Sequence, residues 1–257
     1  MLDKKHRKER GLKIWRYVDL AKFVHMLATG SLYFACPSEL KDPYEGWLPR
    51  SHMKALMEIN RGVLDQMKSA QDTFLAQHPT RDRAPFDALL QDARRKLDLQ
   101  KQLREANSNF GVNCWHINEH ESESMWQLYT AAGQGIAIET TKARLEAALK
   151  GDGINVDQVR YADFDRDEID KGHRHYGLFL KRKSFAHEQE LRATILLPKP
   201  GSGTLVPCDL GGLIAKIHIF PKAPSYYADA VRYAAERADP AIKAPVVTSK
   251  LLDPSDY

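Results

Sequence analysis

Hydrophobic positions near the start of the chain change from strand-like to helix-like spacing and back. Residues 14–18 form a short aromatic and β-branched run, which predicts a strand. Apolar residues at helical spacing over 20–27 predict a helix that Asp19 caps and Gly30 ends. Residues 32–35 predict a second strand, so the chain is expected to begin with a strand, a helix and a strand.

Residues 52–108 have a different pattern. Apolar side chains recur there at helix-like intervals, separated by charged and Gln residues, which predicts amphipathic helices. The polar break at 78–81 predicts two helices in a hairpin that is inserted into the rest of the fold. We interpret this hairpin as a packing element, with the docking of a partner as the alternative.

Strand-like patterns return after Phe110. The predicted strands cover residues 111–116, 136–139, 156–161, 187–197 and 213–220, and the predicted helices cover 122–129, 141–149 and 226–237. Strands and helices are mixed without regular β-α-β spacing, which predicts an α+β fold with a mixed, mainly antiparallel sheet. We expect a single domain over 1–257, with a basic arm at 1–13 and a polar tail at 239–257.

The positive charge of the chain is concentrated at its start. The 257 residues include 38 Lys and Arg against 34 Asp and Glu, a net charge of +4. Residues 1–16 contain seven basic and two acidic side chains, or +5, so the other residues sum to −1. This distribution excludes a uniformly basic nucleic-acid-binding surface but leaves the arm as a candidate contact for an anionic partner.

Several classes of protein are excluded by missing motifs. No stretch approaches the roughly 20 apolar residues that span a bilayer, and no signal peptide follows Met1. We therefore expect a cytoplasmic protein without membrane contact. Cys36, Cys114 and Cys208 are widely separated, which predicts neither a disulfide framework nor a metal site. The chain also lacks a nucleophile elbow and a P-loop motif.

The run over 184–195 is the most informative candidate for chemistry. If it forms a strand, alternation places Glu188, Glu190 and Arg192 on one face. Two neighbouring carboxylates suit reactions in which positive charge develops on a sugar. One of them stabilises an oxocarbenium-like centre, and the other binds or activates a hydroxyl group. The alternative is a solvent-exposed strand edge with an ion pair.

Arg16 is the second candidate. It stands in an apolar strand between Trp15 and Tyr17, where its guanidinium group can bind a phosphate or pyrophosphate through two nitrogens. The alternative is an ion pair with Asp42 or Glu45. Asp42 and Glu45 lie in a turn-rich loop, from which their carboxylates can reach a ribose or Arg16.

Two aromatic side chains, Trp126 and Tyr129, are three residues apart and share a face of a predicted helix. They belong either to the core or to a platform for a ligand. Gly133 and Gly135 lack the third glycine of a dinucleotide-binding fingerprint, so we interpret them as a turn.

Taken in order, these segments resemble the bacterial DUF2971 family, which has no assigned function. Two positions depart from its pattern, because Lys41 replaces the usual Asn and Phe185 the usual Trp. The resemblance covers most of residues 14–220 outside the hairpin. The matching segments are Trp15-Arg16-Tyr17, residues 23–27, Gly30-Ser31-Leu32-Tyr33-Phe34, Lys41-Asp42-Pro43-Tyr44-Glu45, Ser124-Met125-Trp126-Gln127-Leu128-Tyr129, Gly133-x-Gly135, and Phe185 with Glu188, Glu190 and Arg192.

A second resemblance, to mono-ADP-ribosyltransferases, rests on an Arg in the first strand and a late E-x-E motif. It implies an ADP-ribosyltransferase-like fold and NAD as the substrate. Arg16 would bind NAD, Glu190 would stabilise the ribosyl transition state, and Glu188 would position or activate the acceptor. The Ser-Thr-Ser motif of that class has no counterpart, since residues 32–35 lie in its place. The other residues expected to surround NAD are Tyr17, Tyr33, Asp42, Trp126 and Tyr129.

These resemblances imply an enzyme that transfers ADP-ribose from NAD to a nucleic-acid or protein acceptor. They also imply a toxin or phage-defence effector, with an antitoxin or another protein as its partner. The alternative is a non-enzymatic module of a defence system, which binds nucleic acid or protein through residues 1–16 and the hairpin at 52–108.

Overall fold

A seven-stranded sheet forms the centre of the protein in the computed structural model, which describes residues 11–130, 133–167, 176–238 and 242–252. The strand order is β11-β10-β4-β1-β3-β8-β5, and every neighbouring pair is antiparallel except β10 and β11. The predicted α+β fold with a mixed, mainly antiparallel sheet is therefore confirmed. The strands of this sheet are β1 (Lys13–Val18), β3 (Phe110–Ile117), β4 (Ile136–Thr141), β5 (Asn155–Gln158), β8 (Glu190–Leu196), β10 (Lys216–Ile219) and β11 (Val246–Thr248).

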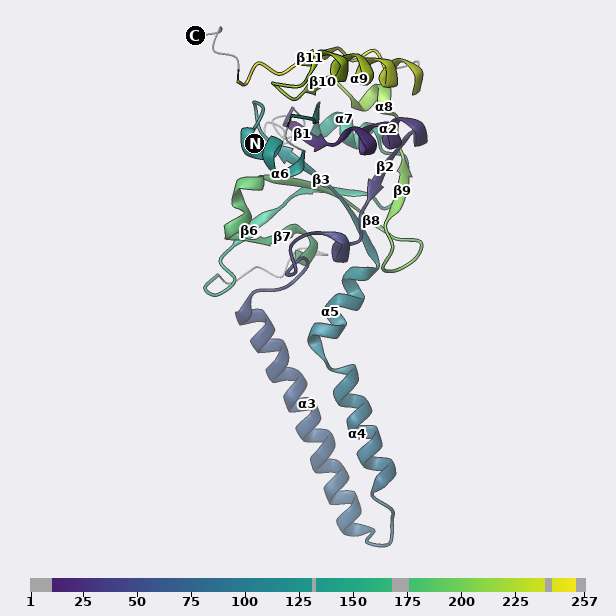
Figure 1. Ribbon diagram of the computed structural model, residues 1–257. Helices are drawn as coiled ribbons and strands as arrows, with labels where there is room; N and C mark the ends of the chain where they lie inside the picture. The colour runs from purple at the N-terminus through teal and green to yellow at the C-terminus, as the bar shows by residue number, and fades with distance from the viewer. Residues whose placement is uncertain (1–10, 131–132, 168–175, 239–241, 253–257) are drawn as a thin grey trace, which may run out of the picture.

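Helices cover one face of the sheet and form the main core with it (Figure 1). Because side chains alternate along a strand, Ile14 and Val18 of β1 face this core while Trp15 and Tyr17 face away from it. The opposite face carries one seven-residue helix and a two-stranded parallel ribbon. The elements on the core side are α2 (Leu20–Thr29), α7 (Lys142–Ala148), α8 (Leu210–Leu213) and α9 (Ser225–Ala238), and those on the opposite side are α6 (Glu123–Tyr129), β6 (Arg160–Ala162) and β7 (Leu180–Arg182).

α2 joins β1 to the second strand and has well-defined ends. The Asp19 carboxylate accepts a hydrogen bond from the backbone N–H of Lys22 at 2.7 Å and so caps the first turn. Phe23 is fully buried in the core. Gly30 ends the helix in the left-handed conformation, with φ of 56°, and its N–H reaches the carbonyl of Leu27. The predicted start and end of this helix are confirmed.

Replacing Gly30 by Ala is expected to lower the free energy of unfolding by about 1–2 kcal/mol. The added Cβ would meet open space, but an L side chain is strained at this positive φ. Gly62, within a helix and also facing open space, is the control, and Gly62→Ala should raise the free energy of unfolding by about 0.5–1 kcal/mol. Urea denaturation measures both free energies of unfolding. A Gly30→Ala variant as stable as the wild type would contradict the expected backbone strain.

The helical insertion projects from the body as a stalk (Figure 1). It consists of α3 (Arg50–Gln77), α4 (Ala84–Lys96) and α5 (Leu99–Ser108), so the prediction of two helices is wrong for the second arm, which is divided. The carboxylate of Asp98 accepts a hydrogen bond from the N–H of Lys101 at 3.2 Å. An Asp in this position starts a new helix, because it satisfies a backbone N–H that has no partner within the helix.

Other boundaries also differ from the sequence pattern. The predicted strand at 156–161 is divided between β5 of the main sheet and β6 of the ribbon. The strand predicted at 213–220 corresponds to β10, which covers only Lys216–Ile219 and follows α8. The tail predicted at 239–257 contributes β11, which pairs in parallel with β10. The predicted second strand, β2 (Ser31–Phe34), pairs with β9 (Thr204–Pro207), for which no strand is predicted.

Most of the predicted basic arm at 1–13 lies outside the described residues, and Lys13 already belongs to β1. The role of the arm therefore stays a prediction. None of the described helices is both long enough and apolar enough to cross a lipid bilayer.

Candidate functional site

A gap in the central sheet creates the candidate site. β1 pairs with β4 along its whole length, but it pairs with β3 only at Ile14–Ile117 and Trp15–His116. β3 itself stays paired with β8 as far as Phe110. The two central strands therefore separate beyond Trp15 while each remains held by its other neighbour.

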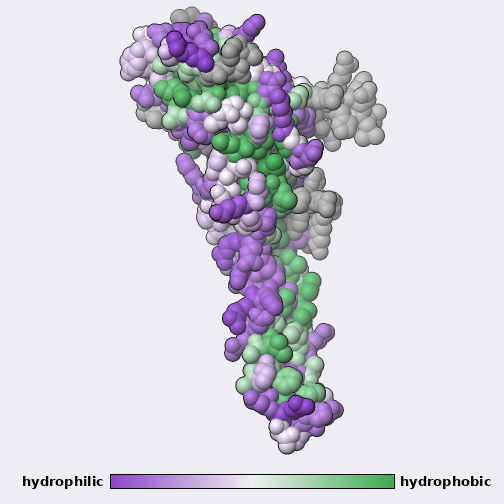
Figure 2. Space-filling view, turned by 90° about the vertical axis from the view of Figure 1, so that its right-hand side faces the viewer, coloured by the Kyte–Doolittle hydropathy of each residue, from purple (hydrophilic) through white to green (hydrophobic). Residues whose placement is uncertain are grey.

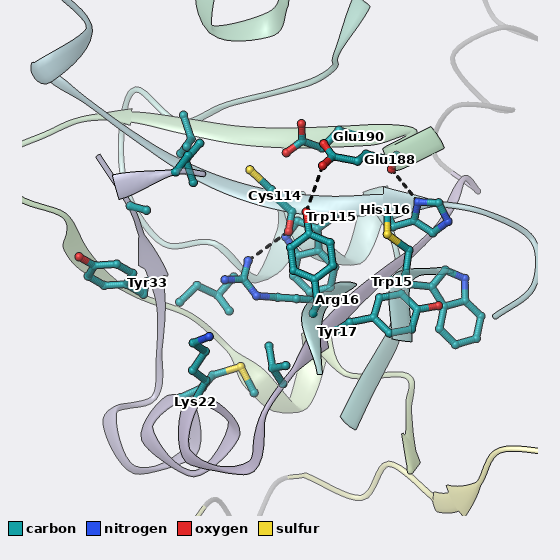
Figure 3. Close-up of a pocket in the computed structure, with 18 of the residues that line it drawn as sticks. Trp15, Arg16, Tyr17, Lys22, Tyr33, Cys114, Trp115, His116, Glu188 and Glu190 are labelled. Atoms are coloured by element: carbon teal, nitrogen blue, oxygen red, sulfur yellow. Dashed lines mark hydrogen bonds between the residues drawn. The ribbon is translucent and has the colours of Figure 1, made fainter. Parts of the chain in front are cut away.

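A cavity of about 700 Å³ fills this gap (Figure 3). α2 and β2 line it on the helix-covered side of the sheet, and α6 and the start of β8 line it on the other side. Ala35 limits the gap at its far end through two backbone hydrogen bonds with Val112 of β3. Because of the gap, Arg16 from one face of the sheet and His116 and Glu190 from the other reach one space.

Arg16 lines the cavity from β1. Its Nη1 donates a hydrogen bond to the carbonyl oxygen of Cys114 at 3.3 Å, and its guanidinium carbon lies 5.7 Å from the centre of the Trp115 ring. Burial lowers the pKa of Arg16, but a guanidinium group stays protonated in proteins. Within the described part of the chain, its close partners include no carboxylate. Its charge is therefore available to an anionic ligand.

The alternative ion pair of Arg16 with Asp42 or Glu45 is wrong. The Asp42 carboxylate binds Arg182, with 2.8 Å between Oδ1 and Nη2. Glu45 binds Arg192 through both of its carboxylate oxygens. Both acidic side chains are buried, so these pairs tie the turn-rich loop to β7 and β8 rather than to β1.

Three glutamates and two cations form a buried cluster beside the cavity. The Lys181 ammonium contacts Glu188 and lies 3.5 Å from Glu190 and 4.0 Å from Glu45. Arg192 is 0 % exposed and binds both Glu190, at 2.8 Å, and Glu45. Glu188 and Glu190 also line the cavity. With three carboxylates against two cations, the cluster carries one net negative charge.

Glu190 is a fixed negative charge in this cluster. Burial by itself raises the pKa of its carboxyl group, but Arg192 and Lys181 outweigh burial and hold the pKa below its ordinary value. Lys181 is also charged, because Glu190 and its neighbours raise its pKa against the effect of burial. The site therefore holds an ionised carboxylate, which can stabilise positive charge but does not donate a proton at neutral pH.

The predicted placement of Glu188 on the same strand as Glu190 is wrong. Glu188 is the last residue of a 3-10 helix, η3 (Lys183–Glu188), and β8 begins at Glu190. Between them, Gln189 adopts the left-handed conformation with φ of 39°, which is uncommon for a residue other than glycine. This turn brings both carboxylates to Lys181, whereas strand alternation was expected to place them on one face of a strand.

Backbone hydrogen bonds hold the turn in place. Nδ1 of His116 lies 2.6 Å from the carbonyl oxygen of Glu188, and the N–H of Ile117 donates to the carbonyl of Gln189 at 2.8 Å. Burial lowers the pKa of His116, so the ring is neutral. Because a carbonyl only accepts, Nδ1 carries the proton. The two carboxylates are thus presented by a rigid segment.

The structure separates the predicted NAD-binding side chains into two groups. The hydroxyl of Tyr129 donates to Oε1 of Glu188 at 3.4 Å, and burial together with Glu188 raises the pKa of Tyr129, so it stays protonated. Trp126 is 1 % exposed and packs edge-on against Tyr17, so it belongs to the core. Of the predicted NAD-binding residues, Arg16, Tyr17, Tyr33 and Tyr129 line the cavity, whereas Asp42 and Trp126 do not.

Sequence reasoning misses three parts of the site. Lys181 ends the apolar run at 178–180, and a Lys next to such a run is a signal for a buried, paired cation. Glu45 is predicted only as a carboxylate that reaches Arg16 or a ribose, whereas it binds Arg192. Cys114 lines the cavity, and burial raises the pKa of its thiol. The thiol is therefore neutral and forms part of the cavity wall rather than acting as a nucleophile.

The cavity thus combines the cation of Arg16 with the carboxylates of Glu188 and Glu190, and tyrosine side chains form part of its walls. Its chemistry has to be inferred from these residues. Comparisons with protein-family models, with curated proteins and with solved structures found no match for this chain.

Proposed function

We propose that this protein is an ADP-ribosyltransferase-like enzyme, in fold and in chemistry, that binds NAD in the cavity between β1 and β3. One observation carries the proposal: Arg16 and the pair Glu188 and Glu190 line one cavity from opposite sides (Figure 3). NAD has groups that complement both sets of charges, a negatively charged pyrophosphate and a positively charged nicotinamide ring.

The size and the walls of the cavity support a ligand of this kind. Its volume of about 700 Å³ lies within the range of roughly 300–1,000 Å³ that is usual for small-molecule sites. Arg16 binds the pyrophosphate, because the planar guanidinium group can donate to two phosphate oxygens at once. Tyr17, Tyr33 and Tyr129 offer aromatic surfaces on which the rings of NAD pack.

The reaction begins with cleavage of the bond between C1′ of the ribose and the nicotinamide nitrogen. The electron pair of this bond goes to nicotinamide, which leaves as a neutral molecule, so the leaving group needs no proton. Positive charge then develops on the ribose. The ionised Glu190 stabilises this charge, because a fixed carboxylate in a buried site needs little reorganisation during the reaction.

Glu188 positions the acceptor. One of its carboxylate oxygens accepts a hydrogen bond from Tyr129, and the other contacts Lys181. As the acceptor atom forms its new bond to C1′, its proton passes to Glu188. We propose a nucleic-acid or protein group as the acceptor. A role as a toxin or phage-defence effector, and an antitoxin partner, stay predictions from the resemblance.

Replacing Arg16 by Met is expected to weaken NAD binding about 10- to 100-fold, because a charge-assisted contact to phosphate is lost. Isothermal titration calorimetry with NAD measures this effect. The control is Arg237→Met, at an Arg on α9 that packs on Tyr233 outside the cavity, which should bind NAD like the wild type.

Labelled NAD and cell extract then identify the acceptor by the transfer of label. The proposal fails if the wild type neither binds NAD nor releases nicotinamide from it. The alternative is a non-enzymatic module that binds through the basic arm at 1–16 and the hairpin at 52–108, and residues 1–10 of this arm lie outside the described residues. Turnover of NAD by the full chain distinguishes the two functions.

A further inference from the structure

The stalk buries few side chains for its length. α3 has 28 residues, of which only Met53 and Gln71 are buried, and α4 adds Leu90. The apolar cluster around Met53 and Leu99 lies at the base of the stalk. Helices in proteins are held mainly by packing of an apolar face, so the distal part of the stalk requires further packing.

An exposed apolar stripe runs along α3 beside its contact with α4. Its members follow one another at intervals of four, four, three and four residues, the spacing of a helix that packs against another helix. Four of them are large and exposed, with exposed fractions between 38 % and 62 %. The stripe consists of Ile59, Val63, Met67, Ala70 and Phe74.

Leu89 of α4 extends this stripe across the stalk. It is 64 % exposed and lies three residues from Phe86, whose ring centre is 5.4 Å from that of Phe74. Figure 2 shows hydrophobic side chains along one side of the stalk and hydrophilic side chains along the other. We call the stripe and Leu89 together the stalk face.

The charged residues of α3 leave the stalk face free. Those between positions 54 and 72 alternate in sign along the opposite side of the helix, as on a solvated surface. With three basic and three acidic members they provide no net charge to attract a lipid surface or nucleic acid. These residues are Lys54, Glu58, Arg61, Asp65, Lys68 and Asp72.

We propose that the stalk face binds the stalk face of a second copy of this chain, so that two stalks form a four-helix bundle. A twofold contact presents the same patch from both copies, and the stripe suits this symmetry. With the two α3 helices antiparallel, Ile59 meets Phe74 of the partner subunit, and Val63 meets Ala70 of the partner subunit. Neither pairing places like charges together. This interface is independent of the proposed NAD chemistry.

The area of the stalk face is sufficient for a stable dimer. The side of the stalk that carries the stalk face is about 30 Å long between residues 55 and 77 and, for two adjacent helices, about 20 Å wide. Each copy therefore buries about 600 Å², or about 1,200 Å² in total, which is the lower limit for specific protein interfaces.

Sedimentation velocity of the full chain tests the dimer. The wild type is expected to be a dimer, and Val63→Glu is expected to raise the dimer Kd at least about 100-fold, because it buries a charge on each side of the contact. The control is Met57→Glu on the same helix. Met57 is 47 % exposed but lies outside the stalk face, so this variant should dimerise like the wild type.

A cross-linking experiment tests the symmetry without a disruptive charge. Gln66 lies near the middle of the stripe, so Gln66→Cys should form a disulfide between copies with oxidised glutathione, whereas Lys68→Cys on the charged side should not. Three outcomes would overturn the proposal: a monomeric wild type, a Val63→Glu variant that dimerises normally, and equal cross-linking at both positions. A monomer that co-sediments with anionic phospholipid vesicles would assign the stalk face to lipid instead.

Discussion

Replacing Glu190 by Gln is expected to lower NAD turnover by about 100- to 1,000-fold while NAD binding stays unchanged. Gln matches Glu in shape but removes the negative charge that stabilises the ribose in the transition state. The fold survives, because Arg192 keeps its contacts with Glu45 and Lys181 keeps its contact with Glu188. Release of nicotinamide measures turnover, and calorimetry measures binding.

The matched control is Glu139→Gln. Glu139 lies on β4 and binds Lys13 and His218, outside the cavity, so its loss should leave turnover at the wild-type level. If Glu190→Gln turns over NAD like the wild type, or if both variants lose activity, Glu190 does not stabilise the reaction.

The same carboxylate sets the behaviour of turnover at low pH. Arg192 and Lys181 hold the pKa of Glu190 below its ordinary value of 4.5. The contribution of the charged form is therefore complete above pH 4.5 and is lost only as the pH falls through the lowered pKa. Loss of Glu190 ionisation should accordingly not reduce turnover between pH 4.5 and neutrality.

Replacing Arg192 by Met is expected to lower the free energy of unfolding by about 3–5 kcal/mol. Met fills a similar space, but it leaves Glu45 and Glu190 buried with only Lys181 to balance them. It also removes the hydrogen bond from Nη1 of Arg192 to the carbonyl of Leu178 at 2.7 Å. Since the total stability of a domain is about 5–15 kcal/mol, this loss is large, and urea denaturation followed by circular dichroism measures it.

An exposed ion pair provides the control for this effect. Arg232 binds Asp229 at 2.9 Å on α9, and its side chain is 46 % exposed. Arg232→Met should therefore lower the free energy of unfolding by less than about 1 kcal/mol. Glu45→Gln removes one charge of the cluster while Arg192 keeps Glu190, and it should cost less than Arg192→Met. Equal stability of Arg192→Met and Arg232→Met would show that burial of the network has no energetic consequence.

Local patterns predict those features whose physical cause is local. Asp19 and Gly30 bound α2 because a side-chain cap and a left-handed glycine act within one helical turn. Arg16 stands out because a charged residue within an apolar strand requires a special environment. Short runs of aromatic, β-branched and alternating apolar residues predict most strands of the main sheet, since each run is local.

Local patterns fail where a single residue or a distant partner changes the chain direction. Gln189 takes a positive φ that its side chain does not indicate, and Glu188 is therefore displaced from the strand. β11 consists of three residues in a polar tail and exists through its pairing with β10. Such short edge strands carry too little periodicity to be distinguished from loops.

From the residue order alone follow the α+β class, the helical insertion and a short set of candidate charged side chains, because each depends on spacing within a few turns or strand residues. The meeting of these side chains depends on pairing between distant segments. Glu45 reaches Arg192 across 147 positions, and Arg16 shares a cavity with Glu190 only because β1 and β3 separate after Trp15. Register and strand order are set by the packing of the whole sheet, so only the folded chain brings Arg16 and the two glutamates to one cavity.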